Sequence, residues 1–488
     1  MNSPLRKLSV VIIVMFFGLM GGATWVQYFQ ADSLNADSRN VRTLYQSHGQ
    51  DRGPIVVAGE AIANSKTVDD AFGYQRVYTD AEMYAPITGW YGMYQMTGLE
   101  RARNAVLNGT DSSQLFARLR ALFTGVENKG GTVELTIDPA AQKAAWDALD
   151  GRNGAAVAID PDTGAILAMV SSPSYDPNKL SAHDSSAVQE YYDKLLDDED
   201  NPLYNRAIGG DLYAPGSAFK LIDLAMLLET GDYEPDTQVP APTQYLLPGT
   251  SDTYIHNPGG GPCGGETVTL QHALTVSCNT PFAKLAVEHG QDALREQAEA
   301  FGFGQRLSIP LQVTPSTLGD IENDAQLAMT AIGQYSVRMT PLQMAMISAA
   351  VANDGTLMTP HLVATERGPD LHVTREADPS VFAEPISSET AETMTQMMLD
   401  VVKNGTGQAA QISGVDVAGK TGTAEIGVEG PSGVTTPNAW FTSFAPADDP
   451  QVAVAVMIEG TEELGAAGTG GHVAAPVAKQ IMQAVLEK

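Results

Sequence analysis

The sequence predicts an α+β fold in which an antiparallel sheet is flanked by helices. A smaller mixed N-terminal domain and one N-terminal transmembrane helix precede this region. Two hairpin patterns support the prediction: apolar runs at 155–159 and 165–170, and at 438–444 and 451–458, each pair separated by a Pro- and Asp-containing turn. Between the hairpins, residues 217–343 show helical spacing of apolar side chains. Strands at both ends with helices between them indicate a single sheet covered by helices.

The composition limits the classes of partner. The chain has 488 residues, with 28 basic and 58 acidic side chains and a formal net charge of −30. This length allows two or three domains with sizeable cores. Because phosphate binding needs a basic surface, the acidity argues against nucleic acid as a partner.

Residues 8–29 form an uncharged, mostly apolar run of 22 residues, and Arg6 and Lys7 precede it. A helix of this length crosses a bilayer core of about 30 Å. We expect a cytoplasmic tail at 1–7, a transmembrane signal anchor at 8–29, and a single-pass protein of the cell membrane whose other domains are extracytoplasmic. A cleaved signal peptide is the alternative, but no Ala-x-Ala pattern directly follows the apolar core.

Residues 30–153 are expected to form the N-terminal domain, a non-catalytic pedestal or interaction module. Residues 52–59 predict a turn and a strand, and 98–107 have the spacing of a helix that ends at an Asn-Gly pair. A short strand at 135–138 is followed by a helix at 139–149, which starts with proline, a residue favoured at the first helical position.

The stretch Ala-Pro-Gly-Ser-Ala-Phe-Lys at 214–220 is the first candidate for catalysis. Ser217 is predicted in the first turn of a buried amphipathic helix, with Lys220 one turn later on the same face. A serine hydroxyl is a poor nucleophile unless a base lies beside it, and helix N-termini favour negative charge. Because Ser-x-x-Lys occurs by chance about once or twice in a chain of this length, this motif alone is a weak signal.

Two further motifs strengthen the signal. Ser-Cys-Asn at 277–279 is predicted in the bend between helices at 269–276 and 281–287, so its serine and asparagine can face a cleft. Lys-Thr-Gly-Thr at 420–423 lies in a strand predicted at 417–426. Three such motifs in this order are far rarer by chance than any one of them.

Cys263 and Cys278 are the two cysteines of the chain. An even number outside the membrane permits a disulfide, which would close a loop of about 15 residues and contribute roughly 3 kcal/mol. Because Cys278 is the middle residue of the Ser-Cys-Asn motif, such a bridge would brace that motif from behind. Two separate buried thiols that pack as small apolar side chains are the alternative.

With these motifs, residues 154–488 resemble the transpeptidase domain of penicillin-binding proteins, in which the three motifs occur in the same order. Further matching phrases are Ala-Ile-Asp-Pro-Asp-Thr-Gly at 158–164, Asn-Arg at 205–206 and Thr-Pro-Leu-Gln at 340–343. With its anchor and N-terminal module, the whole chain is similar to the class B enzymes. The resemblance implies a β-lactamase-like transpeptidase fold for 154–488 and a pedestal domain at 30–153.

The resemblance also implies a serine-type D,D-transpeptidase, which cross-links peptidoglycan stem peptides through an acyl-enzyme and releases D-alanine. Ser217 would be the nucleophile, and Lys220 would accept its proton. Ser277 would relay a proton to the leaving amine, and Asn279 would hold Lys220 and a substrate amide.

Substrate binding would fall to the Lys-Thr-Gly-Thr strand. Lys420 would supply a positive field for the substrate carboxylate and help keep the catalytic lysine neutral. Thr421 and Thr423 would bind that carboxylate, and Gly422 would let the peptide approach an exposed strand edge. Backbone N–H groups of the nucleophilic serine and of Thr423 would form the oxyanion hole.

The partners that the resemblance implies are D-Ala-D-Ala stem peptides, lipid-linked precursor polymer, and β-lactams as covalent inhibitors. They also include proteins of cell-wall synthesis, cell shape and division, such as a membrane glycosyltransferase. We expect no cofactor and no metal, because the eight histidines lack metal-site spacing. Two alternatives stay open: a hydrolase such as a D,D-carboxypeptidase or β-lactamase, and a non-catalytic division scaffold.

Overall fold

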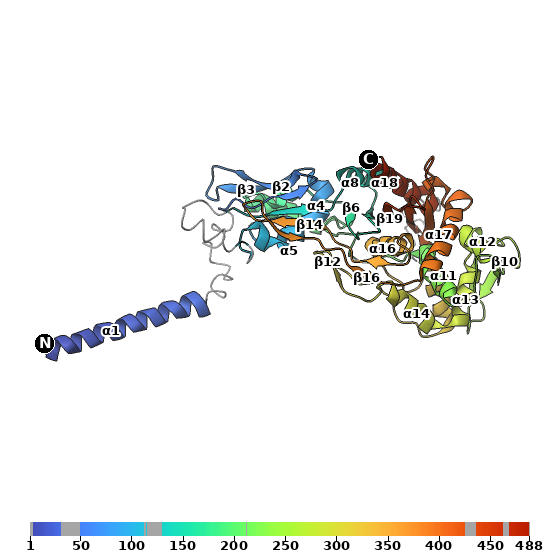
Figure 1. The fold of residues 1–488 in the computed structure, drawn as a ribbon, viewed down its shortest axis with the longest axis horizontal. Coiled ribbons are helices and arrows are strands. Elements are labelled where there is room, and N and C mark those ends of the chain that lie inside the picture. Colours follow the sequence, from blue (N-terminus) through green and yellow to red (C-terminus); the bar gives the residue numbers. More distant parts are fainter. Residues whose placement is uncertain are drawn as a thin grey trace.

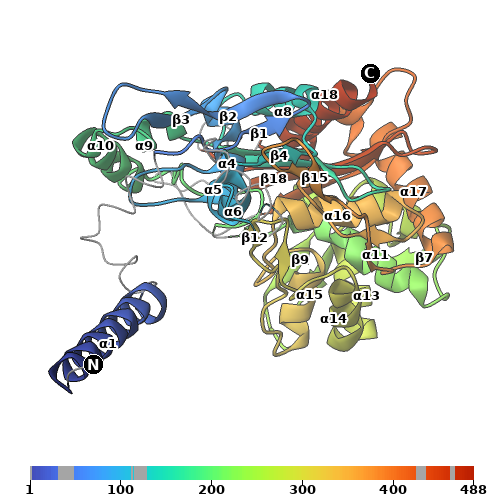
Figure 2. The same cartoon turned by 60° about the vertical axis from the view of Figure 1, so that its left-hand side comes forward.

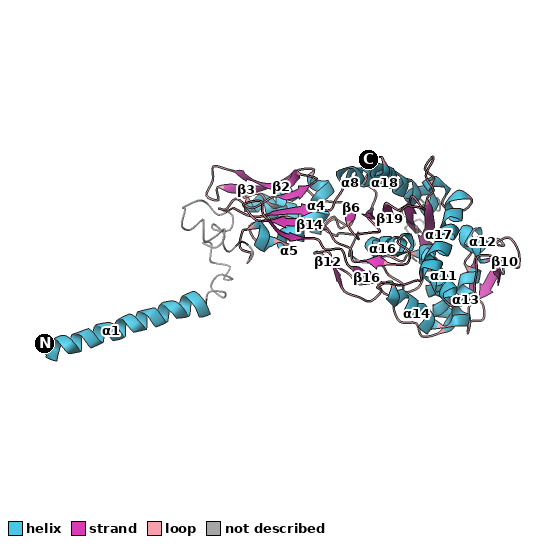
Figure 3. Cartoon of the chain, viewed as in Figure 1, coloured by secondary structure: helices cyan, strands magenta, loops and turns pink. Residues whose placement is uncertain are grey.

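The computed structural model describes residues 3–30, 49–111, 114, 129–210, 212–424, 436–461 and 468–487. Figure 1 shows an isolated N-terminal helix and a larger body. In that body the strands gather in two main places, and several helices lie at the end where α13 and α14 are labelled (Figure 3).

The N-terminal helix is α1 (Ser3–Thr24), which continues as one π-helical turn, η1 (Trp25–Phe29). Together they form a helix of 27 residues that is long and apolar enough to cross a membrane, and none of its residues is buried. The expected apolar helix is therefore present, and it begins before residue 8 because the short preceding segment is also helical.

A five-stranded antiparallel sheet forms the centre of the larger domain, as the two hairpin patterns predict. Its strands are β5 (Gly154–Ile159), β6 (Ile166–Ser172), β17 (Ala418–Ala424), β18 (Asn438–Ala445) and β19 (Val452–Ile458), in the order β17-β18-β19-β5-β6. The register pairs Lys420 with Thr442 and Val456 with Ala156. Residues from both ends of the larger domain thus meet in one sheet, and β17 is one of its edges.

Both faces of this sheet are covered by helices, which explains why its strands read as continuous apolar runs. Helices α8 (Pro139–Leu149) and α18 (Ala475–Leu486) pack on one face, and α16 (Pro341–Ala352) packs on the other (Figure 1). Along β5, Ala156 and Ala158 belong to the core with α8 and α18, whereas Val157 and Ile159 belong to the core on the opposite side. The predicted fold class is confirmed.

The helical part of the domain follows the nucleophile motif. It consists of α11 (Lys220–Glu229), α12 (Leu270–Thr275), α13 (Thr280–His289), α14 (Gln291–Ala300), α15 (Asp324–Ala331) and α17 (Ser388–Lys403). Short strand pairs extend from it: β7 (Gln238–Pro240) with β10 (Thr267–Thr269), β8 (Gln244–Leu246) with β9 (Tyr254–His256), β11 (Leu307–Ser308) with β12 (Gln312–Val313), and β13 (Leu357–Met358) with β16 (Val381–Ala383). Helices α9 (Pro177–Leu180) and α10 (Ser185–Leu196) follow β6.

A six-stranded sheet forms the N-terminal part of the body (Figure 2). Its strands are β1 (Ile55–Val57), β2 (Glu60–Thr67), β3 (Tyr74–Tyr78), β4 (Thr132–Leu135), β14 (Val363–Arg367) and β15 (Val373–Glu376), in the order β15-β14-β4-β1-β2-β3. Three short helices accompany them: α4 (Ala81–Thr88), α5 (Gly98–Ala102) and α6 (Asn104–Leu107).

Strands β14 and β15 belong to the N-terminal sheet, although the sequence analysis divides the two domains at residue 153. They come from the range that the sequence assigns to the larger domain, yet β14 pairs with β4 of the N-terminal sheet. Without β14, the backbone groups of β4 on that side would be unpaired, so the returning segment covers an open sheet edge.

The helix predicted at 98–107 is interrupted in the structure. It is split into α5 and α6 at Arg103, whose backbone leaves the helical conformation. The Arg103 side chain pairs with Glu366 of β14 at 2.6 Å, whereas Asn104 turns toward Arg52 and accepts a hydrogen bond from its Nη1 at 2.8 Å. The two successive residues at the helix break thus contact different parts of the N-terminal domain.

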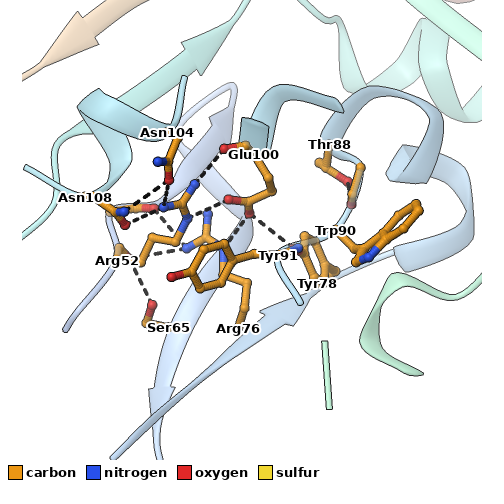
Figure 4. Close-up of polar contacts among 12 residues, drawn as sticks. Arg52, Ser65, Arg76, Tyr78, Thr88, Trp90, Tyr91, Glu100, Asn104 and Asn108 are labelled. Carbon is orange, nitrogen blue, oxygen red and sulfur yellow. Dashed lines mark hydrogen bonds and ion pairs between the residues drawn. The ribbon is translucent and has the colours of Figure 1, made fainter. Parts of the chain in front are cut away.

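A buried ionic cluster holds the N-terminal sheet to α5 (Figure 4). Both oxygens of Glu100, which has 0% exposure, accept from an arginine at 2.6 Å: one from Arg52 Nε and one from Arg76 Nε. The Tyr78 hydroxyl donates to Glu100 at 3.2 Å, and the Arg52 guanidinium lies 4.2 Å from the centre of the Tyr91 ring. Burial acts to raise the pKa of Glu100, but Arg76 and Arg52 outweigh it and hold the pKa below its usual value.

We expect Glu100→Gln to destabilise the N-terminal domain by about 3–5 kcal/mol, because two buried guanidinium groups would lose their counter-charge. In the wild type, this contribution is fully present above the ordinary glutamate pKa and is lost as the pH falls through the lowered folded-state pKa. Urea unfolding of the full chain as a function of pH measures both effects. Glu134→Gln is the matched control, since its 3.4 Å pair with Arg367 is about one-third exposed and is expected to contribute at most about 1 kcal/mol.

Candidate active site

The nucleophile motif begins in a 3-10 turn, η3 (Gly216–Phe219), that runs directly into α11. The sequence predicts Ser217 in the first turn of an α-helix. In the structure it lies instead in the tighter 3-10 turn that precedes the helix. Gly216 has a φ of 54°, and a Cβ there would lie 2.3 Å from the carbonyl oxygen of Thr423. Glycine thus lets the serine turn pack directly against β17.

Two hydrogen bonds, one from a backbone N–H group and one from a tryptophan side chain, hold this turn in position. The Gly216 N–H donates to the carbonyl of Gly333 at 2.9 Å, and Trp440 Nε1 of β18 donates to the carbonyl of Ala214 at 2.9 Å. Both partners are distant in sequence and belong to no motif, so sequence reasoning missed them. Ser217 itself is half-buried.

Lys220 is completely buried, with 0% exposure, and it lies among polar atoms of two motifs. Its Nζ contacts Ser217 Oγ at 3.0 Å, the carbonyl of Ser277 at 2.8 Å and Asn279 Oδ1 at 2.7 Å. The structure thus brings the first two motifs together around one amine. The contact with Ser217 has the geometry that transfer of the serine proton to the lysine requires.

The pKa of Lys220 lies well below its ordinary value. Burial is the main cause, the neighbouring Lys420 ammonium is the second, and Asp223 acts in the opposite direction. A neutral amine can accept a proton, whereas an ammonium cannot. The environment of Lys220 therefore favours the form that can act as a base.

The Ser-Cys-Asn motif lies between α12 and α13, as predicted, and Ser277 has a φ of 62°, which turns the chain sharply. A disulfide links Cys278 to Cys263, whose Cα atoms are 6.0 Å apart. Asn257 Oδ1 accepts from the N–H groups of Asn279 and Thr280, each at 3.0 Å. The motif is therefore held from the Cys263 loop and from Asn257, a residue that the sequence did not single out.

Lys420 joins the third motif to the second. Its Nζ donates to Ser277 Oγ at 2.8 Å and to the carbonyl of Thr421 at 2.8 Å. It is completely buried, and this burial lowers its pKa to about 7. Lys420 also acts to lower the pKa of Lys220, so the two buried amines are electrostatically coupled.

The remaining residues of the third motif lie along the edge strand β17. Thr421 is buried and its hydroxyl is 2.6 Å from that of Thr406, while Thr423 is half-buried. A Cβ at Gly422 would lie 2.5 Å from the carbonyl oxygen of Pro215. Glycine at position 422 therefore lets the nucleophile turn pack closely against β17, and the close approach of a substrate peptide at this residue stays a prediction.

Two histidines lie beside the Ser-Cys-Asn motif. His272 Nε2 lies 3.0 Å from the carbonyl of Cys263, and the backbone carbonyl of His256 accepts from Asn279 Nδ2 at 2.7 Å. Within the described residues, no group of three or more His, Cys, Asp or Glu side chains is arranged to hold a metal ion. The site is built from hydroxyl, amine and amide groups.

Comparison with known families and proteins gives one consistent result. Residues 154–483 match the penicillin-binding protein transpeptidase domain, and residues 52–133 match the penicillin-binding protein A dimerisation domain. The chain is 45% identical over 497 residues to the peptidoglycan D,D-transpeptidase PbpA of Mycolicibacterium smegmatis, and the match covers 100% of both chains. It is 43% identical over 496 residues to the protein of that name from Mycobacterium tuberculosis, with 100% of this chain and 99% of the other covered.

Solved structures agree with the sequence matches. The ceftriaxone acyl-enzyme of M. tuberculosis penicillin-binding protein A superposes with a TM-score of 0.86 at 42% identity, covering 91% of this chain and 100% of that chain. Its penicillin G acyl-enzyme gives a TM-score of 0.84 at 43% identity, with 90% and 100% covered. The chain therefore belongs to the penicillin-binding protein family, and its three motifs all lie within the matched transpeptidase domain.

Proposed function

We propose that this chain is a class B peptidoglycan D,D-transpeptidase of cell-wall synthesis, which β-lactams inhibit by acylation. The observation that carries the proposal is the position of the Lys220 amine, within 3.0 Å of Ser217 Oγ and 2.7 Å of Asn279 Oδ1. A buried neutral amine beside a serine hydroxyl can accept the hydroxyl proton and so activates the serine as a nucleophile. The full-length match of the chain to D,D-transpeptidase relatives indicates the class of reaction.

In the first half of the reaction, Ser217 Oγ attacks the carbonyl between the two terminal D-alanines of a stem peptide. The hydroxyl proton passes to Lys220. Ser277, whose hydroxyl lies 2.8 Å from Lys420 Nζ, relays a proton to the departing D-alanine amine. The C–N bond breaks, an ester forms at Ser217, and free D-alanine leaves.

In the second half, the amine of another stem peptide attacks the ester carbonyl carbon and forms the cross-link. The ester C–O bond breaks, and a proton from the attacking amine returns to Ser217 Oγ through Lys220. The substrate adds along the free edge of β17, where Thr421 and Thr423 bind its carboxylate in the field of Lys420. The N–H groups of Ser217 and Thr423 stabilise the oxyanion, which is typically worth about 3 kcal/mol per donor. The close packing of Gly216 on Thr423 supports this placement of the two donors.

The anchor and the N-terminal domain complete the proposal. Residues 1–7 are cytoplasmic, 8–29 span the cell membrane, 30–153 form most of the pedestal and 154–488 form the extracytoplasmic catalytic domain. The apolar helix at the N-terminus and the disulfide between Cys263 and Cys278, a bond typical of oxidising compartments, support this topology. The pedestal would contact other proteins of cell-wall synthesis and division, such as a membrane glycosyltransferase.

A transfer assay distinguishes cross-linking from hydrolysis. The full chain in detergent is given a D-Ala-D-Ala stem peptide with and without an added amine acceptor. A transpeptidase forms an acceptor adduct that increases with acceptor concentration, and it makes little free acid. A rate of free-acid release that does not depend on acceptor concentration would instead identify a carboxypeptidase.

A further inference from the structure

Asp223 is a buried carboxyl group that the proposed mechanism does not use. It lies in α11 three residues after Lys220, a spacing that places the two side chains on neighbouring positions of one helix face, with Cβ atoms about 5–6 Å apart. Both residues have 0% exposure. Within the described part of the chain, neither carboxyl oxygen of Asp223 has a hydrogen-bond partner.

Such a group costs stability. An unpaired carboxyl in an apolar interior loses its hydration without regaining hydrogen bonds. The neighbouring positions of α11 are apolar and fully packed, so a leucine at position 223 would suit the helix better than an acid. A buried polar group without a partner therefore calls for an explanation in terms of function.

Lys220 is the ionisable side chain nearest to Asp223 along α11, and it is fully buried as well. The helices packed against α11 are α13, α14 and α17, and all of their ionisable side chains keep at least partial exposure to solvent. These side chains are Lys284, Glu288, His289, Asp292, Arg295, Glu296, Glu299, Glu389, Glu392, Asp400 and Lys403. Burial raises the pKa of Asp223 well above its ordinary value, and Lys220 acts to lower it.

Lys220 thus stands between two opposing influences. Lys420, which meets the second motif at Ser277, lowers the pKa of Lys220, and Asp223 raises it. Lys220 uses its own hydrogen bonds for Ser217, Ser277 and Asn279, so Asp223 acts on it through space rather than by direct contact.

We infer that Asp223 is a positioning residue for acyl transfer: in its ionised form, its buried side chain is the counter-charge that sets the base strength of Lys220. The inference rests on the proposed function of Lys220 as the base. A carboxylate near the amine raises the pKa of Lys220. The neutral amine is then a stronger base, but Lys220 stays protonated up to a higher pH. Lys420 has the opposite effect, and the balance of the two fixes the pH range in which Ser217 is activated.

The proton balance of the step is simple. The Ser217 hydroxyl proton moves to the Lys220 amine as Oγ bonds to the β-lactam carbonyl carbon and the ring C–N bond breaks. A proton then passes from Lys220 through Ser277 to the ring nitrogen, and the amine is neutral again. Asp223 neither gains nor loses a proton overall; it stabilises the transient ammonium on Lys220.

The test is the pH profile of acylation by benzylpenicillin, measured with the full chain for the wild type, Asp223→Asn and Asp223→Leu. Both variants are expected to move the acid limb of the acylation rate to lower pH by about one pH unit. Both are also expected to lower the limiting rate severalfold, because the amine is a weaker base. Asp232→Asn, a loss of charge in the exposed loop after the same helix, should leave the profile unchanged.

Each outcome decides the inference. Asp223→Leu is expected to fold at least as stably as the wild type, because it replaces an unpaired buried acid. An acid limb that coincides with the wild type in folded variants would overturn the inference, as would failure of both variants to fold, which would give Asp223 a structural role. A wild type that is not acylated at all would instead refute the proposed function.

Discussion

Lys220→Met is expected to slow acylation of Ser217 by a penicillin about a thousandfold or more. Methionine fills a similar volume, so the buried site stays packed, but its sulfur cannot accept the serine proton. The contact that is lost joins Lys220 Nζ to Ser217 Oγ at 3.0 Å. Stopped-flow mixing with benzylpenicillin gives the wild-type rate, and labelling with a fluorescent penicillin over hours gives that of the variant.

Lys220→Arg separates the role of the base from that of the charge. A guanidinium keeps the positive charge, but it does not lose its proton in proteins, so this variant should be as slow as Lys220→Met. Lys284→Met, on the partly exposed face of α13, is the matched control and should acylate at the wild-type rate. Appreciable acylation by Lys220→Arg would mean that the lysine acts by its charge alone.

Lys420→Ala is expected to weaken initial binding of a carboxylate-bearing penicillin at pH 6 by about 30-fold or more, which corresponds to roughly 2 kcal/mol. The pKa of Lys420 is about 7, so in the wild type this cation is lost as the pH rises through 7 and penicillin binding should weaken. The variant lacks the cation at every pH and should show no such change. Rapid-mixing titrations between pH 5.5 and about 8.5 would measure both.

The same substitution should also move the acid limb of the acylation rate to higher pH. Lys420 lowers the pKa of Lys220, so its removal leaves Lys220 protonated over a wider range. This displacement is opposite to the one expected for Asp223→Asn, so a general loss of structure cannot explain both. An unchanged acid limb in Lys420→Ala would contradict electrostatic coupling of the two lysines.

Local sequence patterns predicted much of the fold and the candidate site. Both hairpins of the central sheet were visible because strands such as β5 and β19 are short, apolar and bounded by Pro-, Asp- and Gly-containing turns. The bend at Ser277 was visible because two helical patterns stop on either side of it. The three motifs meet around Lys220, although the sequence could give only their order and not their distances.

Features made by distant segments could not be predicted in this way. Strand β14 reads as an ordinary short strand, and nothing near it in sequence shows that it covers the edge of β4, more than two hundred residues earlier. The cluster around Glu100 has the same origin, since Arg52 precedes β1 and Arg76 lies in β3, whereas Glu100 lies in α5. In the sequence, Asp223 is one polar residue within an apolar helical run. Its complete burial, with no hydrogen-bond partner for its carboxyl group among the described residues, becomes apparent in the structure.

The most direct test of the proposed function is the mass of the intact protein after incubation with benzylpenicillin, for the wild type and for Ser217→Ala. Wild-type protein should gain the mass of one penicillin and keep it for hours, with the adduct on the peptide that contains Ser217, and the variant should gain nothing. An adduct that forms equally in Ser217→Ala, or a wild type that gains no mass, would contradict the assignment of Ser217 as the nucleophile. Rapid release of penicilloic acid would show a β-lactamase instead of a transpeptidase.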